Sequence, residues 1–194
     1  MTNLIRLTLL GNQLTNLTLP SAITKLGFLD VGDNQLSSLN LPAGLSELNF
    51  LRLSGNKLTS LSLPPGMTNL AAMFLRSNQL TSLIVPSGLT RLVQIDVMGN
   101  QLTSLTLPPD ATQLVTLGLQ GNPLPTLVLS EPAAATNLLG TVSQLRDQGI
   151  DVFTYPLAVQ IIRLKALSPP PLCPGPFASF AGSTAVFIIV CERI

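Results

Sequence analysis

LNFLRLSGNKLTSLSLPPGMTN, residues 48–69, is one copy of a 22-residue unit that recurs through most of the chain. Positions 1 and 11 of the unit are always leucine, position 9 is always asparagine, and positions 4 and 6 are always Leu, Ile, Val or Met. This strict period predicts a stack of similar coils in which each coil packs only on its neighbours. The six copies begin, at intervals of 22 residues, at Leu4, Leu26, Leu48, Leu70, Leu92 and Leu114.

The unit also predicts the path of the chain within a coil. Apolar residues alternate at positions 4 and 6, which predicts a short strand with these side chains in the core and a parallel sheet on one concave face. We expect the invariant asparagine to bond backbone groups of its own and the adjacent coil as a ladder. Position 8 is glycine except for Asp33 and Ser77, which predicts a turn with positive φ.

The second half of the unit predicts another extended segment. Positions 14–16 alternate again and are followed by proline at position 17 in the first five copies. Proline supplies no N–H to a strand ladder, so a second short strand would end there. A unit this short leaves no room for a full helix on the convex side, and we therefore expect a mostly β solenoid.

The pattern LxxLxLxxNxL, repeated six times in register over residues 2 to about 130, resembles the leucine-rich-repeat family. The LTSLxLP half and the 22-residue length are similar to bacterial members. The resemblance implies a right-handed solenoid that binds protein or glycan ligands on its concave face. It also implies an extracellular or cell-surface location, whereas residues 1–10 do not resemble a signal peptide, because Arg6 interrupts the apolar run.

The composition excludes several classes of function. Charged residues make up only 10% of the chain and the formal net charge is +1, so nothing favours nucleic acid or an anionic membrane surface as partner. The chain has no histidine, the commonest metal ligand and general base. No apolar run reaches the roughly 20 residues of a membrane span.

Sequence motifs for catalysis are also lacking. The chain contains no GxSxG, Walker A or GxGxxG motif. Asp30 and Asp96 occupy the same position three coils apart, which strand spacing converts to about 14 Å. Paired glycosidase carboxylates lie only about 5 to 9.5 Å apart. We expect a protein without enzymatic activity, cofactor or metal.

The two ends of the repeat array differ from its middle. Residues 131–167 predict a helix–strand cap, with a helix at 136–149 and a strand at 150–155, which would cover the C-terminal end of the solenoid. Residues 168–194 predict a Pro-rich linker and an apolar tail, in which Cys173 and Cys191 either pair or stay free. The first coil has no predicted cap, so we expect self-association through it.

A ligand site is expected where the repeat varies. Side chains at positions 3, 5 and 7 should point outward from the concave strands, and these positions differ from coil to coil. Aromatic residues and arginine gather in the middle coils, which is typical of interface hot spots. The alternative interpretation is isolated surface residues of little energetic consequence. The predicted partner-binding residues are Phe28, Asp30, Phe50, Arg52, Phe74, Arg76 and Asp96.

The convex side supports a second hypothesis of a different class. Positions 12, 13 and 15 carry mainly Ser, Thr and Asn in the first five coils, for example Thr15, Ser60 and Thr106. A regular lattice of hydroxyl groups on a flat β surface resembles ice-binding or crystal-binding solenoids. The alternative is that small polar residues are simply favourable at exposed turns and strands.

Overall fold

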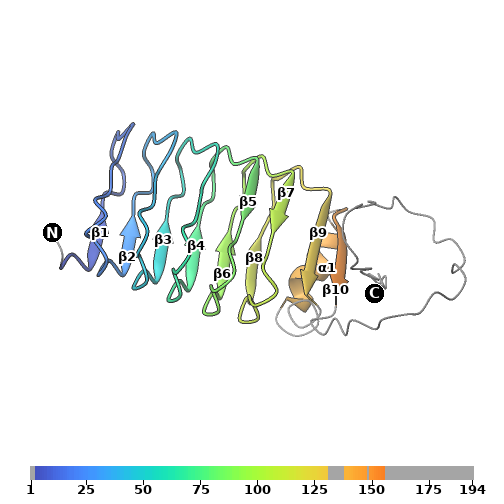
Figure 1. The fold of residues 1–194 in the computed structure, drawn as a ribbon. Helices are drawn as coiled ribbons and strands as arrows, with labels where there is room; N and C mark the ends of the chain where they lie inside the picture. Colours follow the sequence, from blue (N-terminus) through green and yellow to red (C-terminus); the bar gives the residue numbers. More distant parts are fainter. Residues whose placement is uncertain (1–2, 131–137, 148, 156–194) are drawn as a thin grey trace, which may run out of the picture.

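The computed structural model describes residues 3–130, 138–147 and 149–155 of the 194-residue chain. Six coils stack side by side into a solenoid, and each contributes one strand to a six-stranded parallel sheet (Figure 1). Equivalent residues pair across the sheet at intervals of 22, as Leu29 does with Leu51. Its strands are β1 (Arg6–Thr8), β2 (Phe28–Asp30), β3 (Phe50–Arg52), β4 (Ala72–Phe74), β6 (Gln94–Asp96) and β8 (Thr116–Gly118).

The core is a column of leucines that runs through the stack. In the third coil, Leu51, Leu53 and Leu58 (positions 4, 6 and 11) are completely buried. Their equivalents in the second, fourth and fifth coils are buried to the same degree. Burying a leucine side chain stabilises a fold by about 1.5–3 kcal/mol, so the repeated leucines are the main force that holds the coils together.

The invariant asparagines form the predicted ladder. Asn56 Nδ2 donates to Leu53 O in its own coil and to Val31 O in the preceding one, both at 3.0 Å. Its Oδ1 accepts a bond of 3.0 Å from Leu36 N, also in the preceding coil. Each amide therefore satisfies backbone groups of two coils. The same bonds recur at Asn34, Asn78, Asn100 and Asn122.

The turn at position 8 has the predicted left-handed backbone in every coil. Gly55 has φ 69°, and the two non-glycine residues there, Asp33 and Ser77, have φ 50° and 55°. Because a Cβ is unfavourable at these angles, glycine is the commonest residue at this position.

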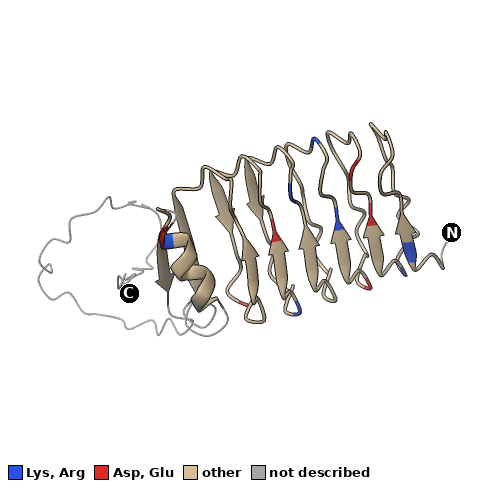
Figure 2. Cartoon of the chain, turned by 180° about the vertical axis from the view of Figure 1, so that it is seen from behind, with Lys and Arg blue, Asp and Glu red and all other residues tan. Residues whose placement is uncertain are grey.

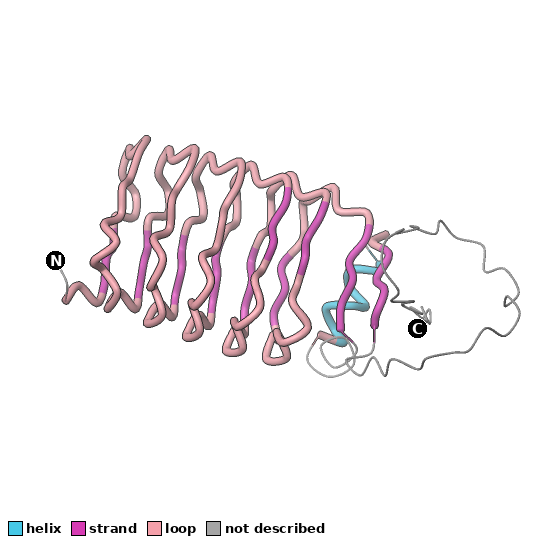
Figure 3. Tube along the Cα trace, in the orientation of Figure 1, coloured by secondary structure: helices cyan, strands magenta, loops and turns pink. Residues whose placement is uncertain are grey.

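The second strand of the unit forms in only some coils (Figure 3). β5 (Ser82–Ile84) pairs with β7 (Ser104–Thr106), and β9 (Thr126–Ser130) occupies the same part of the sixth coil. The first two coils share only one isolated bridge, between Thr18 and Asn40. Strand structure here is therefore confined to positions 13–15 of the fourth and fifth coils and 13–17 of the sixth, one residue earlier than the predicted start.

A helix and a strand follow the sixth coil at the C-terminal end of the described residues. Helix α1 (Leu139–Asp147) lies beyond β8, on the side of the six-stranded sheet (Figure 2), and buries Val142 and Leu145. Strand β10 (Asp151–Tyr155) pairs in parallel with β9. Gly149, with φ 81°, ends the helix. Together they continue the core past the last coil.

Several predictions fall outside the described residues. These are the first residues of the predicted helix (136–137), the rest of the predicted cap (156–167), the Pro-rich linker and apolar tail (168–194), and the state of Cys173 and Cys191. At the other end, β1 pairs only with β2, and Ile5 and Leu10 are exposed. Self-association through this coil stays a prediction.

Candidate ligand-binding face

The outward side chains of the six-stranded sheet, at positions 3, 5 and 7 of the coils, form what we call the sheet face. Register places each of these residues beside its equivalent 22 residues away, so Phe28 lies next to Phe50 and Asp30 next to Arg52. The sheet face carries most of its charge on β1, β2, β3 and β6 (Figure 2). These side chains make three groups of contacts on neighbouring strands: Arg6 with Phe28 and Phe50, Arg52 with Asp30 and Phe74, and Arg76 with Asp96 and Met98.

The position 3 row begins with a cation and two aromatic rings. The Arg6 guanidinium lies 4.0 Å from the centroid of the Phe28 ring. The Phe28 and Phe50 rings are 6.1 Å apart and tilted by 48°. Such contacts favour a fixed arrangement of the rings. Phe50 is 42% exposed. Phe28, which lies between Arg6 and Phe50, is less exposed.

The position 5 row holds Arg52 between a carboxylate and a ring. Arg52 Nη1 lies 3.7 Å from Asp30 Oδ2, and the guanidinium lies 5.2 Å from the Phe74 centroid. Arg52 thus contacts side chains from both neighbouring strands, Asp30 on β2 and Phe74 on β4. Asp30 and Arg52 therefore lie side by side on neighbouring strands.

Asp30 differs from expectation in its exposure. The prediction treated it as an outward, accessible group, but only 4% of the residue is exposed. Its Oδ1 accepts a bond of 3.1 Å from Gly32 N. A Cβ on Gly32 would lie 3.1 Å from Leu10 Cδ1 and 3.3 Å from Asp30 Oδ1, so the glycine leaves room for both groups, and Arg52 of the next coil lies on the other carboxylate oxygen. Contacts from a neighbouring coil therefore cover a group that the strand directs outward.

A second carboxylate shows the same arrangement. Asp96 Oδ1 accepts a bond of 3.1 Å from Met98 N, and its Oδ2 lies 3.1 Å from Arg76 Nη2. The same guanidinium contacts Met98 Sδ at 2.8 Å. A glycine also lies close to this carboxylate, here on the next strand, where a Cβ on Gly118 would lie 3.1 Å from Asp96 Oδ1. Both aspartates are consequently recessed below their arginines.

Comparison with solved structures agrees with this architecture. An internalin (InlF) of Listeria monocytogenes superposes with a TM-score of 0.58 at 22% identity, covering 82% of this chain and 44% of the internalin. The chain thus spans less than half the length of that protein. Neither a protein-family model nor a curated protein matches the chain significantly.

The fold is that of a leucine-rich-repeat protein. Other leucine-rich-repeat structures superpose less well. The domain of InlJ from Listeria monocytogenes gives a TM-score of 0.48 at 23% identity, over 66% of this chain and 34% of that one. A Shigella effector domain gives 0.45 at 21% identity, over 79% and 82% of the two chains.

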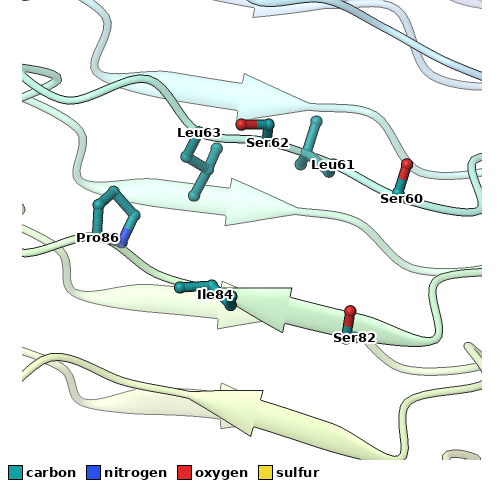
Figure 4. Close-up of a pocket in the computed structure, with 7 residues that line it drawn as sticks. All are labelled: Ser60, Leu61, Ser62, Leu63, Ser82, Ile84 and Pro86. Carbon is teal, nitrogen blue, oxygen red and sulfur yellow. The ribbon is translucent and has the colours of Figure 1, made fainter.

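The opposite face of the leucine-rich-repeat stack consists of positions 12, 13 and 15. Every Ser, Thr and Asn of these rows is exposed in the first five coils. The lattice is interrupted, because Ile84 and Val128 are exposed apolar residues within it. A hollow of about 310 Å³ also lies between the third and fourth coils, where Ser60 and Ser62 of one coil face Ser82 and Ile84 of the next (Figure 4).

Metal and membrane sites receive no support from the described part of the leucine-rich-repeat chain. Within it, no three His, Cys, Asp or Glu side chains lie close enough together to hold a metal ion. No helix there is both long and apolar enough to cross a bilayer.

Two further members of the sheet face were missed in the sequence. Arg6 stacks on Phe28 and Met98 contacts Arg76, yet neither was among the predicted residues. Both signals were present, because Arg6 precedes Phe28 by one repeat and Met98 follows Arg76 by one repeat. The seven predicted residues do lie together, and their role in binding stays a prediction.

Proposed function

We propose that this protein is a non-enzymatic binding scaffold that holds a protein segment, or a glycan, on its sheet face. The observation that carries the proposal is the set of contacts among arginine, aromatic and aspartate side chains on that face, which leaves Phe50 and Arg52 about half exposed. Aromatic and arginine side chains of this kind supply most of the binding energy in protein interfaces.

Prior ordering of these side chains is the proposed mechanism. Immobilising a flexible side chain at an interface costs about 0.5–1.5 kcal/mol. Arg52 is already held by Asp30 and Phe74, and Phe50 already packs on Phe28. A ligand would meet groups whose positions are fixed by the sheet, so little further ordering would oppose binding.

The fold supports a scaffold role in a general way. Each coil adds one strand at a fixed spacing, so outward residues can change without disturbing the buried leucines and asparagines. This separation suits recognition by a broad surface. Ligand identity has to come from the variable residues themselves.

A screen of the full chain would test the proposal. The immobilised protein is probed with a phage-displayed library of random peptides and with a glycan array, and binders are remeasured on two variants. Phe50→Ser should weaken binding by at least about tenfold, whereas Ile84→Ser, on the opposite face, should leave it unchanged. Unchanged melting curves show that both variants fold. Equal loss with both variants, or loss only with Ile84→Ser, would contradict the proposal.

Adsorption of the opposite face to ice or a crystal is a second candidate. Its supporting observation is the exposure of the Ser, Thr and Asn side chains in the three rows. The hollow beside Ile84 makes this surface less even than a flat lattice requires. A thermal-hysteresis measurement on the full chain tests the candidate, and freezing without hysteresis would remove it.

A further inference from the structure

We infer that the ligand of the sheet face is an acidic protein segment that also carries an apolar side chain, an inference that rests on the proposed function. Its basis is an asymmetry within the ion pairs. The side chains of Arg52 and Arg76 are 50% and 52% exposed, whereas those of Asp30 and Asp96 are only 6% and 16% exposed. A face with nearly balanced formal charge therefore presents mainly positive groups.

Arg6 adds a third cation to the sheet face. It is exposed and contacts Phe28 and Thr8. The charged residues at positions 3, 5 and 7 are thus three arginines with exposed side chains and two aspartates that are largely covered. Such an arrangement attracts negative charge and speeds the encounter with an acidic partner.

Hydrogen-bonding capacity has the same asymmetry. Each oxygen of Asp30 and Asp96 already has a backbone N–H or a guanidinium as neighbour. A guanidinium has five N–H donors, and the contacts of Arg52 and Arg76 occupy only part of them. The charged groups of the face therefore offer donors rather than acceptors. Carboxylates accept from arginine in strong, paired bonds, whereas a hydroxyl-rich glycan also needs acceptors.

The apolar requirement comes from Phe50. It lies on the same strand as Arg52, two residues away, and both side chains point outward, about 7 Å apart along the strand. A ligand that satisfies both would place a carboxylate and an apolar side chain at that separation. In an extended segment this is the distance between residues i and i+2.

The edges of the sheet face do not change this inference. Asp33 and Lys57 lie on the turns after the strands, and Lys25, Glu47 and Arg91 precede the strands at the other edge. Each edge carries both signs of charge. The exposed arginines in the centre therefore determine which charge is attracted.

The experiment uses the full chain and the random peptide library. Peptides enriched on the protein should contain more Asp and Glu than the unselected library, together with an aromatic or aliphatic residue. Arg52→Gln should weaken their binding by about tenfold and Arg52→Glu by more, while Arg91→Gln, a charge change outside the face, should have less than about a twofold effect. Raising the salt concentration should weaken binding.

The possible outcomes distinguish a failure of this inference from a failure of the proposed function. Peptides whose binding depends on Phe50 but which show no acidic excess, or which bind Arg52→Glu equally well, would overturn the inference and leave the binding face in place. Enriched peptides that are insensitive to Phe50→Ser would overturn both. If only glycans bind, and do so through Phe50, the acidic-segment inference fails while the scaffold proposal stands. No enrichment of peptides at all would also reject the inference.

Discussion

On the sheet face, all six coils contribute a paired strand, while the outward side chains differ from coil to coil. On the opposite face, the outward side chains are mainly Ser, Thr and Asn in the first five coils, yet among the described residues only β5 with β7, and β9 with β10, form paired strands. The sheet face therefore combines a regular backbone with varied side chains. The opposite face combines similar side chains with a less regular backbone. Buried groups below the surface set the backbone order, and the outward residues do not.

The difference has a physical origin in the asparagine ladder. Asn56 and its equivalents lie four residues after the end of each sheet strand and fix backbone groups of two coils at once. The opposite face has prolines at position 17 instead, which end its strands and add no N–H. A face on which backbone geometry is fixed can vary its side chains freely, which suits it to recognition.

The largest expected effect concerns that ladder. Asn78→Ala should lower the free energy of unfolding by about 3–5 kcal/mol, because Leu58 N, Leu53 O and Leu75 O lose their buried partner. Asn12→Ala is the matched control, since Asn12 is exposed and its two bonds stay within its own coil. Its cost should be below about 1 kcal/mol. If urea denaturation showed equal losses of unfolding free energy for the two variants, the asparagine ladder would not explain the difference between the two faces.

The covered carboxylate of the sheet face comes next. Asp30→Ala should cost about 2 kcal/mol, since the buried Gly32 N–H loses its acceptor. Arg52→Gln should cost less than about 1 kcal/mol, because Arg52 is half exposed. Urea denaturation of both variants measures these losses. If Arg52→Gln were the more damaging change, the ion pair rather than the backbone bond would stabilise this site.

The turn at position 8 should respond with opposite signs. Ser77→Gly should stabilise the protein by about 0.5–1 kcal/mol, since glycine tolerates φ 55° without a Cβ penalty. Gly99→Ala, at φ 63° in the next coil, should destabilise it by about 1–2 kcal/mol. Thermal melting of both variants measures the two shifts. Shifts in the same direction would show that this turn does not require the left-handed backbone.

The smallest effect is expected on the opposite face. Ser60→Ala and Ser82→Ala should each change the free energy of unfolding by less than about 0.5 kcal/mol, because both side chains are exposed. Hydrogen exchange sharpens the comparison: amides of the paired strand β7 should exchange more slowly than those of residues 60–62, where no strand is assigned. Equal exchange rates would mean that the two parts are equally ordered.

The features that recur from coil to coil could be predicted from the sequence. Leu51 and Asn56 have equivalents 22 residues away, so their burial and bonding follow from one unit. The packing around Asp30 could not be found this way, because it combines Leu10 of one coil with Gly32 of the next. Neither residue recurs at its position, and a contact between non-repeating side chains leaves no periodic signal.

Pairing beyond the repeats was only partly predictable. Helix α1 and strand β10 lie within the residue ranges in which a helix and a strand were expected, whereas the cap as a whole stays a prediction. The parallel pairing of β10 with β9 was not predicted, because it joins a non-repeating strand to a repeat. The 22-residue period is sufficient to identify the cross-strand neighbours of Phe50 and Arg52. The low exposure of the two aspartates depends on side chains of adjacent coils that do not repeat, so the period does not indicate it.

The direction of the asparagine bonds has a consequence for assembly on the ribosome. Asn34 binds Leu14 N and Leu9 O, which lie 20 and 25 residues before it, and each later asparagine does the same for its predecessor coil. The bonds from an asparagine side chain to the backbone of the preceding coil can therefore form only after the coil that carries the asparagine has been synthesised. Synthesis from the N-terminus supplies these side chains in the order of the coils, so each new coil brings the asparagine that completes the bonds of the coil before it.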